Sequence, residues 1–294
     1  ATQRRPPAAS ESKQSQSTTR CRHKAAQIAH HARGNRAVHV CRYHGWAYDS
    51  SGRNVAVRGR AEGAYSPAFD EERHDLQPVA AFDAYRGFLF ASLKPTPVTL
   101  EQHLGDTRLF IDMIVDQSPD GVELVPGVVR YSFDGNWKLQ LENSIDAYHF
   151  PATHPSYLRL LDRRATMKER TDVPPAVWQG DGGRQVEDLM GSFGFEAGHA
   201  LVWTTSPIER HPLYPQCAEL RARVGAQTTD WMMRTRQFNL FPNLQLASNA
   251  ALQMRVIRPV AVNRTEMLSY CLAPVGEPPA SRTRRLRQYE DFFN

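Results

Sequence analysis

Cysteine is scarce in this chain: only Cys21, Cys41, Cys217 and Cys271 occur among 294 residues. Four thiols are too few for the disulfide framework of a small secreted domain, so a reducing, cytoplasmic setting is expected. The sequence also lacks a run of 18 apolar residues, and its N-terminus is polar rather than apolar. These absences argue against a membrane span, a membrane partner and a secretory signal.

Acidic residues are rare near the N-terminus. Residues 1–36 hold eight Lys or Arg against the single acid Glu11, within a chain of net charge +5. A basic stretch can bind nucleic acid, but this one lacks interleaved aromatics and any nucleic-acid-binding motif. We therefore expect no nucleic-acid partner. Residues 1–19, rich in Pro, Ser, Gln, Thr and Arg, are predicted to be a disordered or irregular tail.

The remaining chain is long enough for two domains. Short alternating patterns at residues 38–41, 45–52 and 78–93 predict β-strands, and Pro95 and Pro97 mark a boundary. We therefore predict a small all-β domain over 20–95, incomplete at its start, and a larger domain over 96–294.

The larger domain is predicted to be α+β, with an antiparallel sheet flanked by helices. Apolar residues at helical or strand spacing define its expected elements. The expected helices are 100–117, a helix containing Asn143, 219–233 and 281–293, the expected strands are 127–139, 238–246, 252–259 and 266–272, and 171–198 is expected to be a loop over the core.

Two thiols and two imidazoles form the first motif. Cys21 and His23 are followed, after 17 intervening residues, by Cys41 and His44. Zinc accepts such a set, but finger-like sites usually take both cysteines from one segment and both histidines from the other. One Cys and one His from each segment favours a two-iron cluster, in which one iron takes both thiolates and the other both imidazoles. Trp46 is expected to contribute to the same site.

A second motif lies near the middle of the chain. Asn143, Asp146 and His149 recur every three residues, so a helix would place them on one face. Pro151 would bend that helix and bring His154 back beside His149. Two neutral imidazoles can then bind one metal, with the carboxylate of Asp146 behind them. The alternative interpretation is a helix that carries a chance pair of histidines.

At these residues the chain resembles the Rieske non-haem iron aromatic-ring-hydroxylating oxygenases, specifically the large (α) subunit. The first motif matches the Rieske motif, and the second matches the family's Asn-x-x-Asp-x-x-His-x₄-His motif. Residues 135–139, 257–259 and 287–294 are similar to the benzoate, toluate, anthranilate and salicylate branch. The resemblance covers about residue 20 to the end, and it implies a chain truncated at both ends.

The resemblance implies two cofactors, a [2Fe-2S] Rieske cluster on the first motif and a mononuclear Fe(II) on His149 and His154. Electrons from an NADH-dependent reductase, with or without a ferredoxin, would pass from the cluster to the iron. The enzyme would then add O₂ to an aromatic carboxylate, by cis-dihydroxylation or hydroxylation. Asp146 and Asn143 are the implied catalytic residues. Asp146 would bridge a cluster histidine of one subunit to His149 of the next in a trimer of α or α/β units, with a small β subunit.

Three departures from the family pattern stand out. Ala25 replaces the usual glycine of the first loop, and Arg42 replaces the usual proline of the second. The space before Cys21 is shorter than in family members, so the first domain is expected to be incomplete. The family's carboxylate ligand would follow Asn294, so little turnover is expected of this chain. The alternatives are a Rieske electron-transfer protein without oxygenase activity and an inactive fragment.

The substrate pocket is implied by position only. In the family it is lined by residues after the first histidine ligand and along the central strands, where cavity-facing and core-facing side chains look alike in sequence. A carboxylated substrate would favour a cation or amide donor near the iron. The expected pocket residues are Phe150, Met190, Gln237, Asn239, Leu246, Asn249 and Gln253.

Overall fold

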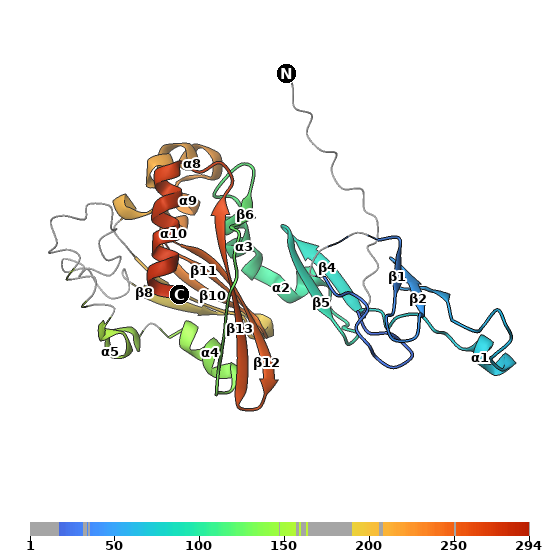
Figure 1. The fold of residues 1–294 in the computed structure, drawn as a ribbon. Coiled ribbons are helices and arrows are strands. Elements are labelled where there is room, and N and C mark those ends of the chain that lie inside the picture. The colour runs from blue at the N-terminus through green and yellow to red at the C-terminus, as the bar shows by residue number, and fades with distance from the viewer. Residues whose placement is uncertain are drawn as a thin grey trace, which may run out of the picture. The chain divides into compact units, whose positions relative to one another are not determined.

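The computed structural model describes residues 18–31, 34, 36–146, 148–156, 159, 163, 190–205, 208–249 and 251–293. They form two compact units, residues 1–100 and 101–294 (Figure 1). The predicted tail lies outside the described residues except for its last two. Thr18 donates its amide to Gln77 O, and the Thr19 carbonyl accepts from Ile28 N, so these two residues belong to the first unit's fold.

The first unit contains two small antiparallel sheets. Strands β1 (Val38–Val40), β2 (Ala47–Asp49) and β3 (Asn54–Ala56) pair in that order. Strands β4 (Ala81–Tyr85) and β5 (Phe88–Ser92) form a hairpin, and α1 (Pro67–Glu71) is a short helix between the sheets. The strands predicted near 38–41, 45–52 and 78–93 are all present.

The second unit follows the predicted α+β class. Its helices are α2 (Leu100–Leu104), α3 (Arg108–Val115), α4 (Trp137–Ser144), α5 (Phe150–Thr153), α8 (Cys217–Val224), α9 (Ala226–Met232) and α10 (Pro279–Phe293), with short 3₁₀ turns η1 (Gly105–Thr107), η2 (Glu196–Gly198), η3 (Ile208–Arg210) and η4 (Tyr214–Gln216). Its strands are β6 (Val122–Leu124), β7 (Val129–Phe133), β8 (Met190–Gly194), β9 (Ala200–Thr204), β10 (Thr235–Leu240), β11 (Leu244–Ser248), β12 (Leu252–Ala261) and β13 (Arg264–Pro274).

These eight strands form one antiparallel sheet in the order β6-β13-β12-β11-β10-β9-β8, with β7 also paired to β13. Side chains alternate between its faces. Phe238 packs on Phe110 of α3, with ring centroids 5.7 Å apart, so this face lies under α3. On the other face, Leu141 of α4 packs with Ile257, and Tyr289 of α10 donates its hydroxyl to the Ser269 carbonyl. Figure 1 shows α10 lying along the sheet.

Two predicted boundaries in this unit are wrong for local reasons. The strand expected over 127–139 ends at Phe133, because the Asn136 side chain accepts a hydrogen bond from Lys138 N and starts α4 at Trp137. The helix expected over 219–233 is two helices, since Gly225 at φ +86° interrupts it.

Two further predictions change in the sheet. The strand expected over 238–246 is a hairpin, with residues 241–243 as its turn, and Pro242 in that turn has no amide for the ladder. The expected loop over 171–198 lies outside the described residues up to 189, and residues 190–194 form edge strand β8 instead. Gly191 and Gly194 give this segment a low strand propensity, because strands favour bulky residues, and the sequence therefore did not indicate a strand here.

Candidate metal centres

The two segments of the first motif fold into loops with the same backbone hydrogen bonds. In the first loop, Cys21 N donates to Ala26 O (2.9 Å) and Ala25 N donates to Cys21 O (2.8 Å). In the second, Cys41 N donates to Trp46 O (2.8 Å) and Gly45 N donates to Cys41 O (2.9 Å). The structure therefore brings together two equivalent loops, each of which presents one cysteine and one histidine.

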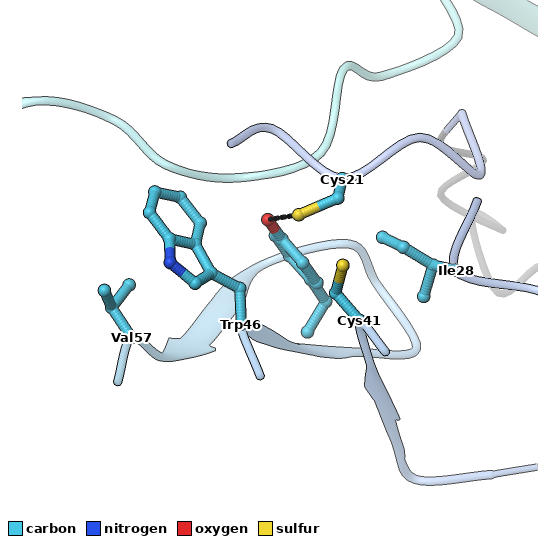
Figure 2. Close-up of a cluster of buried hydrophobic side chains, with 6 residues drawn as sticks. Cys21, Ile28, Cys41, Trp46 and Val57 are labelled. Carbon is cyan, nitrogen blue, oxygen red and sulfur yellow. Dashed lines mark hydrogen bonds between the residues drawn. The ribbon is translucent and has the colours of Figure 1, made fainter. Parts of the chain in front are cut away.

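The structure places the two thiols of the first motif together and the two imidazoles together. Figure 2 shows Cys21 and Cys41 in the buried cluster that also contains Trp46 and Ile28. The rings of His23 and His44 lie together, with centroids 4.5 Å apart and an angle of 65°. Paired thiols and paired imidazoles fit a two-iron cluster, because each iron then takes two ligands of one kind.

Trp46 supports the cluster loops from the side. Its indole stacks on the His23 imidazole, with centroids 4.9 Å apart and planes 8° from parallel. It also meets His74 and Phe69 edge-on, at 5.4 and 6.0 Å. Because a stacked indole restricts the rotation of the imidazole, Trp46 orients His23 rather than supplying a ligand atom.

Tyr48 was missed by sequence reasoning, although its place in an apolar strand beside the second loop was a usable signal. The residue is fully buried, and its hydroxyl lies 3.3 Å from Cys21 Sγ (the dashed line in Figure 2). Its oxygen accepts from Arg22 N at 3.2 Å, and once Cys21 is a thiolate the hydroxyl is the only donor in its pair with the sulfur. Burial, followed by the hydrogen bond to Cys21, raises the pKa of Tyr48, so it stays a donor.

Replacing Tyr48 with Phe is expected to lower the reduction potential of the cluster. Hydrogen bonds to cluster sulfurs stabilise the more negative, reduced form. A bond to a charged acceptor contributes about 1.5 kcal/mol, which corresponds to a shift on the order of 60 mV for one electron. Redox titration followed by EPR measures the shift. Tyr43→Phe is the control, because Tyr43 is exposed and contacts the His44 ring; an equal shift in both variants would refute the sulfur bond as the cause.

Replacing Ala25 with Gly is expected to stabilise the first unit by about 0.5–1 kcal/mol. Ala25 has φ +56°, and its counterpart Gly45 has φ +76°, so the same left-handed turn holds alanine in one loop and glycine in the other. Denaturant unfolding tests the gain. The reciprocal control, Gly45→Ala, should lose about 1 kcal/mol. A loss in Ala25→Gly would mean that the Ala25 methyl packs usefully.

The second motif is not one bent helix, as predicted, but two helices joined by a turn. Helix α4 ends at Ser144, and α5 begins at Phe150. Asp146 organises the turn, because its Oδ1 accepts from Tyr148 N (2.7 Å) and from His149 N (3.3 Å). The carboxylate competes with the helical ladder for these amides, which explains the break better than Pro151 does.

This turn orients His149. Asn143 Nδ2 donates to His149 Nε2 at 3.1 Å, so Nε2 presents a lone pair and the proton sits on Nδ1. The Asp146 Oδ2 atom lies 3.3 Å from Nδ1. A carboxylate behind one ring nitrogen and a lone pair on the other is the arrangement of metal-ligating histidines. The predicted juxtaposition of Asn143, Asp146 and His149 is therefore present, through a turn rather than a helix face.

His154 completes the pair predicted for the mononuclear iron. The His149 and His154 rings lie with centroids 5.5 Å apart. Burial, and then the neighbouring His149, lower the pKa of His154, so its ring is neutral as a ligand must be. Within the described residues no third His, Cys, Asp or Glu joins this pair. Glu290 and Asp291, on α10, instead lie 3.8 Å from Arg287.

The predicted pocket residues divide between the two sheet faces. Gln237, Ala247 and Gln253 are directly paired across β10, β11 and β12, on the face that α4 and α10 cover. Leu246 is buried on the opposite face, paired with Phe238 under α3, and so does not join them. Ala247, one residue from Leu246 in the alternating strand, takes the position between Gln237 and Gln253.

The other predicted pocket residues lie at different places in the second unit. Asn239 is buried and joins α4 to the sheet, because its amide donates to Leu141 O (2.7 Å) and its carbonyl accepts from Ser144 Oγ (2.6 Å). Asn249 accepts from Ala251 N in a tight turn. Met190 lies half-exposed on β8. Phe150 starts α5, and its side chain lies outside the described residues.

A polar network missed by sequence reasoning fixes the end of α4. The Gln245 amide donates to Gln140 O (2.9 Å), to Ser144 Oγ (2.8 Å) and to Asn239 Oδ1 (3.1 Å). Because Ser144 is the last residue of α4, this network positions the turn that carries His149.

Among the described helices, none is long and apolar enough to cross a bilayer.

Comparison with known proteins gives relatives over nearly the whole chain. Toluate 1,2-dioxygenase subunit alpha of Pseudomonas putida is 40% identical over 280 residues, which is 93% of this chain and 60% of that protein. The 2-halobenzoate 1,2-dioxygenase large subunit of Burkholderia cepacia is 37% identical over 93% of this chain and 58% of its own length. The chain thus spans about three fifths of these relatives.

The same fold occurs in a solved structure. Naphthalene 1,2-dioxygenase from Rhodococcus sp., bound to indole, aligns with a TM-score of 0.74 and 24% identity over 95% of this chain and 64% of that chain. Residues 11–70 match the model of the Rieske [2Fe-2S] domain, and residues 124–294 match the ring hydroxylating alpha subunit catalytic domain. The ligand sets at both centres agree with these matches, and the chain belongs to the family of ring-hydroxylating α subunits.

Proposed function

We propose that this chain is the α subunit of a terminal oxygenase that adds O₂ to the ring of an aromatic carboxylate. The observation that carries the proposal is the presence of both ligand sets in one chain. The loops with Cys21 and Cys41 fit a two-iron cluster, and the turn with His149 and His154 fits a mononuclear iron. An electron-transfer protein needs only the first of these sets.

The surroundings of the second set support a small aromatic substrate. The sheet face next to α4 carries Gln237, Ala247 and Gln253 side by side. Gln253 donates to Ser269 Oγ at 2.7 Å, while its carbonyl oxygen is buried and, among the described residues, has no donor. A small alanine side chain between two amides supports a site that combines low bulk with polar groups, as a substituted ring requires.

The carboxylate class rests on the relatives. Those that align with 93% of this chain are named for toluate, halobenzoate and anthranilate, and the chlorobenzene and benzene dioxygenase subunits align with 45%. We infer the same substrate class here.

The chain's own residues have defined tasks in this proposal. The bound irons would supply electron transfer and oxygen activation. The negative charge of Asp146, 3.3 Å from His149 Nδ1, favours the tautomer with the proton on Nδ1, which leaves Nε2 to bind metal. Asn143 must release Nε2 when metal binds, because both cannot use one lone pair. The Gln245 network holds α4, and hence the turn, against the sheet.

The proposed assembly supplies the remaining parts. We infer that electrons come from a reductase and that Asp146, whose side chain is 44% exposed, reaches a cluster histidine of a neighbouring copy. A trimer with a small β subunit would provide that neighbour. The half-exposed carboxylate supports this role, since part of the side chain remains accessible to a second imidazole.

The test combines metal content with oxygenation. Protein loaded anaerobically with iron and sulfide should contain three irons per chain, and after reduction it should give a rhombic EPR signal. With reductase and NADH, ¹⁸O₂ should enter benzoate, toluate or anthranilate, even if at a low rate, but not benzene. Two irons and no label in any acid would favour a Rieske electron-transfer protein. A colourless, zinc-loaded protein would overturn both iron assignments.

A further inference from the structure

Arg236, at the start of β10, carries a buried charge without a counter-ion. The residue is 2% exposed, its Nη1 donates to Met113 Sδ (3.1 Å), and its Nη2 donates to Ser248 Oγ (2.9 Å). Its buried Nε has no acceptor, and no carboxylate in the described part of the chain lies within ion-pair distance. Burial lowers the pKa of Arg236 to about 10, which still leaves it charged at neutral pH. A thioether and a hydroxyl do not offset a full charge.

The neighbouring charged groups do not remove this excess. Arg285, fully buried on α10, is already paired with Glu277, whose Oε2 lies 3.0 Å from its Nε. Arg282 has Glu123 at 2.6 Å as well as Glu277 at 3.1 Å. Glu277 and Glu123 are therefore engaged by Arg285 and Arg282, and neither carboxylate lies within ion-pair distance of Arg236.

Two further buried groups, His211 within the field of Arg236 and Gln117 just after α3, have side-chain polar atoms that form no well-aligned hydrogen bond. His211 Nδ1 accepts from Leu213 N at 3.2 Å, so its proton is on Nε2, which is buried and faces the Asn249 backbone without a well-aligned hydrogen bond. The fields of Arg285 and Arg236 reach this imidazole and, after burial itself, lower its pKa. Gln117 lies four residues after Met113, the residue that contacts Arg236, and its buried amide is unsatisfied at both atoms among the described residues.

We propose that Arg236 is the centre of a binding site for one small monovalent inorganic anion of the chloride type, with His211 and Gln117 as candidate further donors. Such an anion accepts hydrogen bonds from several donors and neutralises the charge at the same time. A water molecule would satisfy the donors but leave the charge uncompensated. The site lies on the α3 side of the sheet, so it is separate from the face next to α4 and does not depend on the proposed oxygenase activity.

The test is thermal unfolding of the whole chain in sodium chloride or bromide, against sodium gluconate at the same ionic strength. A ligand that binds only the folded state raises the midpoint, here by roughly 5 °C. Ser248→Asp places a carboxylate beside Nη2. It should raise the midpoint in gluconate and abolish the difference between halide and gluconate. Ser192→Asp, an equal charge change at an exposed position on β8, should keep that difference.

Bromide also gives a structural readout that does not depend on any variant. An anomalous peak beside Arg236 in crystals grown with bromide is expected, and Arg236→Met should remove it. Equal midpoints in halide and gluconate for the unaltered chain would overturn the proposal. So would an ordered water and no bromide at Arg236, even if Ser248→Asp failed to fold.

Discussion

Acidification from pH 7 to pH 5 is expected to cost the folded chain about 2 kcal/mol through His211 alone. Burial, and then the nearby Arg285 and Arg236, lower the pKa of His211 from 6.5 to about 3. In the unfolded chain, His211 therefore binds a proton below about pH 6.5. In the folded chain, it does so only below about pH 3. Stability is full above pH 6.5 and falls by about 1.4 kcal/mol for each pH unit below it, approaching 5 kcal/mol at the lower limit.

Urea unfolding at a series of pH values, with ionic strength and chloride held constant, measures this slope. His211→Gln should flatten it, because a neutral amide can accept from Leu213 N and does not titrate. The slope should not vanish, since burial also lowers the pKa of His199. His31→Gln, at an exposed position, should leave the slope unchanged. An unaltered slope in His211→Gln would show that His211 does not remain neutral in the folded state.

Asp146→Asn is expected to weaken metal binding at the second centre about 10–100-fold. The amide keeps the shape of the turn, since its oxygen can still accept from Tyr148 N and His149 N. It loses the negative charge 3.3 Å from His149 Nδ1, which makes the ring more basic and fixes its orientation. The first unit should keep its cluster, because both of its loops lie outside this turn.

Cobalt(II) titration, followed by visible absorption, measures the loss without requiring turnover. Glu142→Gln is the matched control: it removes the same charge from an exposed residue of α4, four positions away. If both variants weaken cobalt binding equally, the effect is general electrostatics and Asp146 has no special role. Equal affinity in Asp146→Asn and the unaltered chain would remove Asp146 from the ligand's hydrogen-bond shell.

Several parts of the candidate sites followed from sequence because their determinants are local. Cys21 with His23 and Cys41 with His44 sit in loops whose hydrogen bonds close within six residues. His149 and His154 are likewise joined by a short segment. Ligand type and spacing were therefore sufficient to predict both pairs, even though the predicted helix around Asp146 was wrong.

Other parts depend on contacts between segments distant in sequence. Strand alternation predicts two faces, but it does not say which face α4 covers. Leu246, a predicted pocket residue, lies on the face opposite α4, and its neighbour Ala247 lies on the α4 face. Asn239, also a predicted pocket residue, accepts from Ser144, 95 positions earlier, and so joins α4 to the sheet.

The sequence by itself determined the ligand chemistry, the α+β class and the family resemblance, since these depend on residue type and short spacing. Only the tertiary structure decided that Asp146 acts through a turn, that Tyr48 bonds a cluster cysteine and that Arg236 is buried without a carboxylate. The physical reason is that burial and hydrogen-bond partners are properties of the packed chain. Burying a guanidinium costs free energy only where other segments exclude water from it. A local sequence pattern does not indicate where that happens.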